Sequence, residues 1–251
     1  MRATSIEFRL RMLINAAIIA LGFWAPWIGV LAPPHGFASR VATLEWLAST
    51  ISRLGLLSFT HAAPLVLIAA SAIAALGAIL RISGAAYLSP AVVQNPGMLA
   101  VSVTAAGPYR YVRNPLYIGL WCMVAAIALT MPPSGALVTM VLLSCFLLRL
   151  ILGEEAFLAG QLGEPYRVYR QAVPRLIPRL RPLLPRLAAK PQWLRGFLSE
   201  LLPVGVFVTF AFISWSYNNR LMLRAILVSL GASLVARAFV GPVQSSPADS
   251  Q

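Results

Sequence analysis

Residues 107–119 read GPYRYVRNPLYIG and lead into a hydrophobic run, and residues 154–178, EEAFLAGQLGEPYRVYRQAVPRLIP, follow the next hydrophobic run. Two consecutive membrane-spanning helices return the chain to the side from which it started. Both stretches are therefore predicted to lie at the same membrane surface. Arginines, tyrosines and a pair of glutamates would then meet at one end of a helical bundle.

The composition predicts an all-α, polytopic transmembrane helical bundle. Hydrophobic residues make up 59% of the chain and charged residues 11%, and several apolar runs approach the roughly 20 residues that cross a bilayer as a helix. The first run is longer than the apolar core of a secretion signal, which favours a retained anchor. About six spans are predicted, at residues 12–32, 62–80, 116–131, 135–152, 197–215 and 221–240.

The arginines predict the orientation of this bundle. They are concentrated before the first span, between the second and third, and between the fourth and fifth. These segments and both termini are therefore predicted to lie in the cytoplasm, at a bacterial inner membrane. Arg220 and Arg224, in the last hairpin, depart from the pattern. The net charge of +13 follows this topology and suits anionic lipid headgroups, which argues against a nucleic-acid partner.

A proline-rich segment, residues 173–195, separates the fourth and fifth spans. It cannot form one long helix, because prolines recur among its leucines and arginines. We interpret it as a strap at the membrane surface, with leucines in the bilayer and arginines among headgroups. The alternative is that it shapes the entrance for a lipid-like substrate. Its prolines are Pro174, Pro178, Pro182, Pro185 and Pro191.

Cysteine and histidine indicate no separate chemistry. Cys122 and Cys145 fall within apolar spans, where a thiol behaves as a small hydrophobic group, and no disulfide is expected. His35 and His61 have no partner at metal-ligand spacing, so no metal site is predicted. No nucleotide-binding glycine motif and no nucleophile motif is present.

The stretch 107–119 cannot be helical throughout, because two prolines interrupt it. Irregular backbone at membrane depth persists only against protein or a watery cavity. Glu154 and Glu155 follow an apolar run, and neighbouring helical positions differ by about 100°. At least one carboxylate is therefore expected to face protein, with Arg113 or Arg110 as its partner.

Two interpretations fit these residues. In the first, the tyrosines form an interfacial belt, the arginines set topology, and the glutamates make a structural ion pair. In the second, the residues bind a ligand. S-adenosylmethionine suits them, because a glutamate matches its ribose hydroxyls and ammonium, an arginine its carboxylate, and aromatic faces its sulfonium and adenine.

The two stretches, in this order, resemble the membrane methyltransferases that include isoprenylcysteine carboxyl methyltransferase and the phospholipid N-methyltransferases. The resemblance runs from about Arg81 to Pro178 and includes RISGAAYLSP, residues 81–90. It implies a cytoplasmic pocket for S-adenosylmethionine and a lipid-like or prenylated acceptor that arrives from the membrane. The methyl acceptor itself, and the choice between O- and N-methylation, are left open.

The resemblance also implies which residues form the pocket. Glu154 and Glu155 would form one wall, and Tyr166 and Tyr169 would close over it. The opposing wall would consist of Tyr109, Arg113, Asn114, Pro115, Tyr117 and Gly119.

The implied reaction is an in-line methyl transfer, which needs proximity and exclusion of water more than a covalent nucleophile. A carboxylate acceptor is already ionised, and Arg110 or Arg170 would orient it. An amine acceptor must lose a proton, for which Glu155 is the candidate base.

The chain departs from the isoprenylcysteine enzymes at Asn114, where they commonly have histidine. The predicted organisation is an N-terminal transmembrane part (1–80), a methyltransferase-like core (81–196), an appended hairpin (197–240) and a disordered tail (241–251). Two alternative functions remain at this point: an NADPH-dependent membrane reductase of the sterol type, and a non-enzymatic membrane scaffold.

Overall fold

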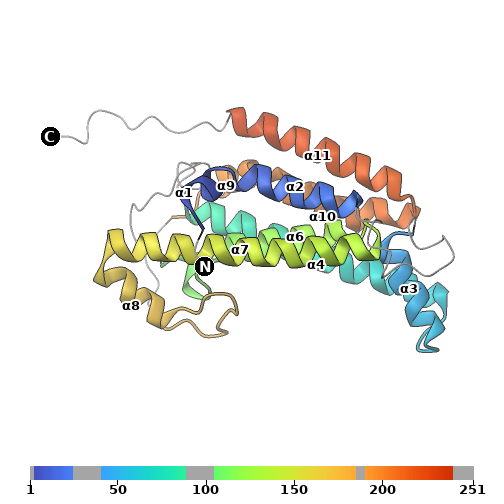
Figure 1. Ribbon diagram of the computed structural model, residues 1–251, viewed down its shortest axis with the longest axis horizontal. Coiled ribbons are helices and arrows are strands. Elements are labelled where there is room, and N and C mark those ends of the chain that lie inside the picture. Colours follow the sequence, from blue (N-terminus) through green and yellow to red (C-terminus); the bar gives the residue numbers. More distant parts are fainter. Residues whose placement is uncertain (1–2, 25–40, 89–104, 185–189, 240–251) are drawn as a thin grey trace.

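The computed structural model describes residues 3–24, 41–88, 105–184 and 190–239, and all regular structure within them is helical. The long helices lie side by side in an elongated bundle (Figure 1), which confirms the all-α prediction. The α-helices are α1 (Ser5–Arg9), α2 (Arg11–Trp24), α3 (Thr43–Arg53), α4 (Phe59–Tyr87), α6 (Pro115–Ala128), α7 (Pro133–Leu162), α8 (Glu164–Ala172), α9 (Trp193–Ser199), α10 (Leu201–Val208) and α11 (Asn219–Phe239). Shorter turns are η3 (Gly107–Arg110), η4 (Thr209–Ile213) and η5 (Ser214–Ser216).

The described part of the chain contains helices that fit a membrane. By length and hydropathy α4, α7 and α11 can each cross one, and α9 with residues 201–216, bent by 71°, would make a fourth span. The helices α2 and α6 are apolar but shorter. All six predicted apolar segments are thus mainly helical where described, with residues 129–131 and Glu200 as turns, while the exact number of spans stays a prediction. Residues 25–32 of the first predicted span lie outside the described residues.

Two helices extend beyond their predicted ends. The fourth predicted span, 135–152, belongs to α7, which continues to Leu162 and ends at Gly163, where the backbone takes a φ of 60°. The second, 62–80, belongs to α4, which continues to Tyr87. The predicted domain boundary after residue 80 therefore falls within α4, and the boundary after residue 196 falls within α9. The predicted tail, 241–251, lies outside the described residues.

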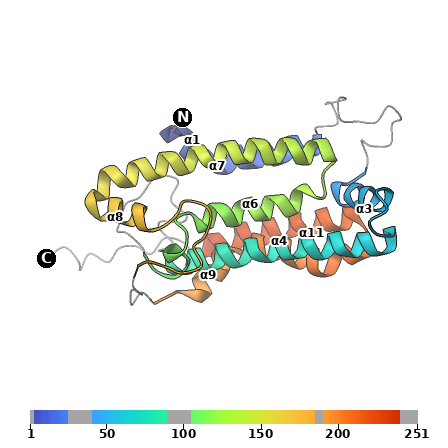
Figure 2. The same ribbon diagram turned by 90° about the horizontal axis from the view of Figure 1, so that it is seen from below.

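Helix α6 lies between α4 and α7 (Figure 2). Glycines allow it to approach α4 closely. A Cβ on Gly119 would lie 2.9 Å from the Gly77 carbonyl oxygen, and a Cβ on Gly77 would lie 3.0 Å from the Gly119 carbonyl oxygen. Any larger residue would push the two helices apart, so these glycines fix the position of the first turns of α6.

The C-terminal helices pack against the rest of the bundle. A Cβ on Gly196 of α9 would lie 2.9 Å from the backbone nitrogen of Ala86 in α4. The backbone N–H of Gln192 donates to the Ala86 carbonyl oxygen at 2.8 Å, and α10 contacts both α4 and α11. The predicted appended hairpin is therefore built into the same bundle as α4.

The two quoted stretches meet at one end of the bundle, as predicted. The opposite end carries α3 and two hairpin turns, where the Asn219 side-chain amide donates to the Thr130 carbonyl oxygen at 3.1 Å. There the backbone N–H of Thr43 also donates to the Met131 carbonyl oxygen at 2.8 Å. In Figure 1, η3 and α8 lie at the end away from α3.

This arrangement yields a topological prediction. Single cysteines at Leu56 and Gln161, both exposed and at opposite ends, are introduced into a protein that lacks Cys122 and Cys145. An impermeant thiol reagent applied to intact cells is expected to label position 56 and spare position 161, because the arginine-rich end should face the cytoplasm. Labelling of position 161 alone would show that the protein has the opposite orientation in the membrane.

Candidate functional site

The irregular segment before α6 begins with a forced turn. Gly107 has a φ of 52°, and a Cβ there would collide with the Tyr87 ring, so only glycine fits. The turn η3 follows, and the chain then stays non-helical until α6 starts at Pro115. Asn114 precedes α6, but its side chain makes no capping hydrogen bond. That side chain is instead available to the site.

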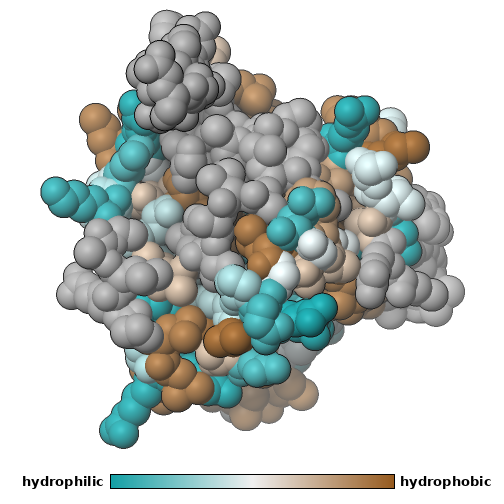
Figure 3. Space-filling model, turned by 90° about the vertical axis from the view of Figure 1, so that its left-hand side faces the viewer, coloured by the Kyte–Doolittle hydropathy of each residue, from teal (hydrophilic) through white to brown (hydrophobic). Residues whose placement is uncertain are grey.

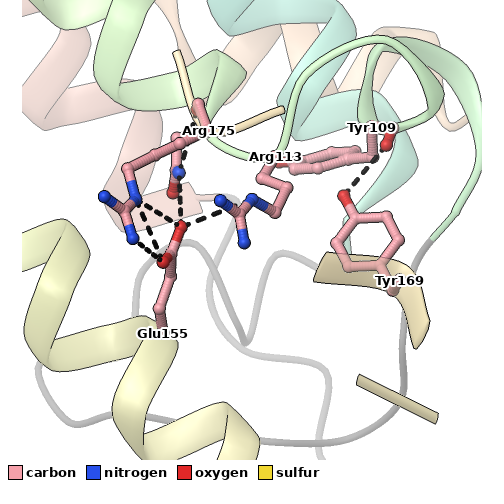
Figure 4. Close-up of polar contacts among 6 residues, drawn as sticks. Tyr109, Arg113, Glu155, Tyr169 and Arg175 are labelled. Carbon is pink, nitrogen blue, oxygen red and sulfur yellow. Dashed lines mark hydrogen bonds and ion pairs between the residues drawn. The ribbon is translucent and has the colours of Figure 1, made fainter. Parts of the chain in front are cut away.

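A buried carboxylate lies at the centre of this end of the bundle. Glu155 of α7 is 4% exposed. Arg175 binds it through Nη2 at 2.9 Å and Nε at 3.1 Å, and Arg113 Nε lies 3.5 Å from its other oxygen (Figure 4). The Asn114 amide donates to the same carboxylate at 3.3 Å. Groups from two separate chain segments, the loop before α6 and the segment after α8, thus compensate one buried charge on α7.

This geometry answers two questions that the sequence left open. Glu155 is the glutamate that faces the irregular segment, and its predicted pairing with Arg113 is confirmed. Arg110 instead donates to the Leu184 carbonyl oxygen, through Nη2 at 2.8 Å. Arg175 was missed as a site residue. Its position within the quoted stretch 154–178 was the feature that could have indicated it. Its partner lies 20 residues earlier in the chain, so local sequence did not reveal the pairing.

Glu154, the neighbouring carboxylate, points to a different element. It accepts a hydrogen bond of 2.8 Å from the hydroxyl of Tyr117 in α6. The ion pairs among the described residues do not include it. The two glutamates therefore have distinct surroundings: two guanidinium groups bind Glu155 directly, whereas Glu154 accepts its hydrogen bond from a neutral hydroxyl and has the charge of Arg11 nearby.

Three buried tyrosines pack beside the Glu155 cluster. The hydroxyl of Tyr169 donates to the Tyr109 carbonyl oxygen at 2.9 Å (Figure 4), and the rings of Tyr166 and Tyr169 lie 5.9 Å apart. Burial, with a further contribution from Glu155, raises the pKa of Tyr166 to about 12. Burial likewise raises the pKa of Tyr169. Both phenols thus stay neutral at physiological pH and remain hydrogen-bond donors.

Some buried donors at this site have no hydrogen-bond partner within the described residues. These are Nη1 of Arg113 and the hydroxyl of Tyr109, together with Nε of Arg113, whose 3.5 Å ion pair with Glu155 is too long for a hydrogen bond of good geometry. Burial lowers the pKa of the Arg113 guanidinium, and Glu155 partly offsets that effect. A buried unpaired donor is costly. A ligand with an acceptor group, above all an anionic one, would be stabilised beside Arg113.

The proline-rich strap, here residues 173–184, lies across the irregular segment. Its Pro174 carbonyl oxygen accepts from the Arg113 backbone N–H at 2.9 Å, and the Arg179 backbone N–H donates to the Tyr111 carbonyl oxygen at 3.0 Å. The prediction that this segment is not one long helix is confirmed for the described residues, since α9 starts only at Trp193. Leu180 of the strap is 97% exposed.

Hydrophobic and hydrophilic side chains lie side by side on this end of the molecule (Figure 3). The strap contributes both kinds, because Ile177 and Leu183 are exposed together with Arg179 and Arg181. An exposed mixture of aliphatic and basic side chains is typical of a segment at a membrane surface. This exposure supports the interpretation of residues 173–184 as a surface strap.

An apolar groove of about 250 Å³ runs between α6 and α7 and reaches the polar cluster. Tyr117, whose hydroxyl binds Glu154, and Leu176, which follows Arg175, lie in its wall. The remaining lining residues are Ile118, Trp121, Ser144, Leu147, Leu148 and Ile151. The groove is therefore almost entirely apolar, and the Tyr117 hydroxyl connects its wall to Glu154 of α7.

Three other predicted site residues either lie apart from the cluster or have a role in helix geometry and packing. Pro115 is buried as the first residue of α6. Gly119 packs against α4. Arg170 is exposed on α8. Arg110 binds the Leu184 carbonyl oxygen. The remaining predicted residues gather around the two glutamates, and the roles of all of them toward a ligand stay predictions. Within the described residues, no group of three or more histidine, cysteine or acidic side chains is arranged to hold a metal ion.

Comparison with protein families gives one match. The family model described as phospholipid methyltransferase matches residues 59–164, which extend from the start of α4 to the start of α8. This match confirms the resemblance to the membrane methyltransferases. It begins before the predicted start at Arg81, and it ends before the strap and the C-terminal helices. No curated protein and no solved structure matches the chain significantly.

The Glu155 cluster predicts how the strap is held. Replacing Arg175 by alanine removes a partly exposed ion pair, worth about 1 kcal/mol, and should raise the open population of the strap roughly fivefold. Trypsin is then expected to cleave after Arg179 about five times faster, as measured by mass spectrometry. Arg167→Ala, which removes an exposed pair with Glu164 on α8, is the control. An unchanged cleavage rate in Arg175→Ala would show that the Arg175–Glu155 ion pair does not hold the strap in place.

Proposed function

Because residues 59–164 match the phospholipid methyltransferase family, we propose that the protein transfers a methyl group from S-adenosylmethionine to a lipid-like acceptor held in the membrane. One observation carries this proposal. A buried cluster of carboxylate, guanidinium and aromatic groups adjoins an apolar groove between α6 and α7. A polar cofactor and an apolar acceptor would thus meet where the groove reaches Tyr117.

The available donors and acceptors fit the cofactor. Arg113 Nη1 is buried without a hydrogen-bond partner among the described residues, which suits the carboxylate of the cofactor, while Nε of the same guanidinium faces Glu155. Glu155 suits its ammonium or ribose hydroxyls, and Tyr166 and Tyr169 offer aromatic faces for its sulfonium or adenine. When bound, S-adenosylmethionine supplies an electrophilic methyl group.

The groove fits the apolar part of an acceptor. Its volume of about 250 Å³ and its aliphatic and aromatic lining suit part of an acyl or isoprenoid chain. Tyr117 lines the groove and binds Glu154. The reactive end of an acceptor seated there would lie beside this hydroxyl and carboxylate.

The two glutamates suit different tasks. Two guanidinium groups bind the Glu155 carboxylate, which suits it to holding the chain segments of the site together. Glu154 binds a single neutral hydroxyl and lies next to the groove. For an amine acceptor we therefore assign proton removal to Glu154, in place of the Glu155 expected from sequence. A carboxylate acceptor needs no base.

The strap and α8 suit exclusion of water. Residues 173–184 cover the irregular segment through backbone hydrogen bonds, and Tyr166 and Tyr169 form the buried face of α8. A displacement reaction gains from a dry, aligned site more than from a covalent nucleophile. The site is proposed to face the cytoplasm, where the cofactor would reach it.

The first test measures cofactor binding. Calorimetry on detergent-purified protein is expected to show binding of S-adenosylmethionine. Both Arg113→Ala and Arg113→Lys should weaken it by roughly ten- to a hundredfold, because a compact ammonium does not replace a planar, two-pronged donor. Arg220→Lys, at the opposite end of the bundle, is the matched control.

Three outcomes of this titration contradict the proposal in different ways. Binding of NADPH instead would favour a membrane reductase. Binding of neither cofactor would favour a non-enzymatic scaffold. Unchanged affinity in Arg113→Lys, in a protein that does bind S-adenosylmethionine, would leave Arg113 as a charge that only sets topology.

The second test measures methylation. Membranes containing the protein and isotope-labelled S-adenosylmethionine are expected to yield labelled lipid, detected by mass spectrometry. Glu154→Gln keeps an acceptor for the Tyr117 hydroxyl and should slow methylation of an amine by about a hundredfold or more. Methylation of a carboxylate should be nearly unaffected. Glu164→Gln, an exposed glutamate on α8, is the control, and equal loss in both variants would refute the role of Glu154.

A further inference from the structure

A second buried ion pair joins the C-terminal helices to α4. Glu200, at the break between α9 and α10, is fully buried. Arg81 of α4 binds both of its oxygens, with Nε at 2.6 Å from one and Nη2 at 2.8 Å from the other. Only 14% of the Arg81 side chain is exposed. The proposed methyl transfer uses neither residue.

Stability alone does not account for this pair. The desolvation of two buried charges offsets most of their attraction, and well-packed apolar residues in their place are often equally stable. A buried pair is better explained where it fixes one arrangement of neighbouring groups. The α9–α10 corner bends by 71°, and this bend brings Glu200 to the side of α4 that carries Arg81.

The remaining contact of Arg81 leads to the proposed site. Its Nη1 donates to the Leu116 carbonyl oxygen in the first turn of α6, at 3.2 Å. A Cβ on Gly119 would lie 2.5 Å from Cγ of Arg81, so the arginine side chain lies directly against α6. Tyr117, which lines the groove and binds Glu154, follows Leu116 in the same turn.

We infer that Glu200 is a positioning residue: it orients Arg81 and, through the Leu116 carbonyl, fixes the first turn of α6 and with it Tyr117 beside Glu154. The inference rests on the proposed function for its catalytic consequence. It gives the C-terminal helices, which lie beyond the family match, a task in that reaction. A displaced first turn would leave the acceptor bound but badly aligned.

The test uses the full-length protein with Glu200→Gln. This variant keeps the shape of the side chain and removes its charge. Misalignment should lower kcat about tenfold or more, while the KM for the acceptor and the affinity for S-adenosylmethionine change less than about threefold. Backbone amides of residues 114–120 should exchange hydrogen about tenfold faster. Glu45→Gln, an exposed glutamate of α3 at the opposite end, is the matched control.

A double variant separates positioning from stability. Glu200→Gln leaves Arg81 buried without its countercharge and is expected to lower Tm. Arg81→Met with Glu200→Leu removes both charges and should restore Tm. It should not restore kcat. Recovery of kcat together with Tm would overturn the inference, because the pair would then serve stability alone.

Two further outcomes also decide the question. A raised KM with unchanged kcat in Glu200→Gln would mean that Arg81 binds substrate directly, which overturns the positioning role. If Glu200→Gln does not fold, the kcat and amide exchange of the double variant decide alone.

The hydrogen-exchange arm keeps this inference distinct from the proposed function. If the wild-type protein methylates no acceptor, the proposed function fails, and exchange at residues 114–120 still reports whether Glu200 holds α6. Equal exchange in Glu200→Gln and Glu45→Gln would overturn the inference even in a protein that is an active methyltransferase.

Discussion

The buried carboxylate of Glu155 is the interaction on which the arrangement of this end of the bundle depends. A charge that is 4% exposed is tolerated only when it is paired. Its partners come from the segment before α6, at Arg113 and Asn114, and from the strap, at Arg175. Compensation of one charge therefore brings together α7, an irregular loop and a segment that has no helix of its own.

The first turn of α6 lies between two buried ion pairs. On one side Asn114 binds the Glu155 cluster. On the other side Arg81, held by Glu200, donates to the Leu116 carbonyl oxygen. Gly77 allows the backbone of α4 to approach α6 closely at Gly119, just after this turn. Helix α6 is short, and these contacts give its end a defined position beside the groove, which packing of apolar side chains alone would specify less strictly.

Polar and apolar parts of the proposed site are built from the same helices. Along α7, Leu147 and Ile151 face the groove, and Glu154 and Glu155 follow within the next turn. Along α6, Tyr117 contributes a hydroxyl to the carboxylate and lies in the groove wall. The apolar wall of the groove and the polar carboxylates thus lie about one helical turn apart. An acceptor could place its apolar chain against the first and its reactive end beside the second.

Local features of the sequence determined much of this protein. Apolar runs predicted the helices, prolines predicted the irregular loop and the strap, and the paired stretches predicted both the family and the meeting of Arg113 with a glutamate. Tertiary structure decided the rest: that Glu155 rather than Glu154 faces the arginines, that Arg175 joins them, and that Glu200 holds Arg81. The physical reason is that hydropathy and helix breaking act over a few residues. The partner of a buried charge is set by packing between segments that lie far apart in the chain, here 119 residues for Arg81 and Glu200.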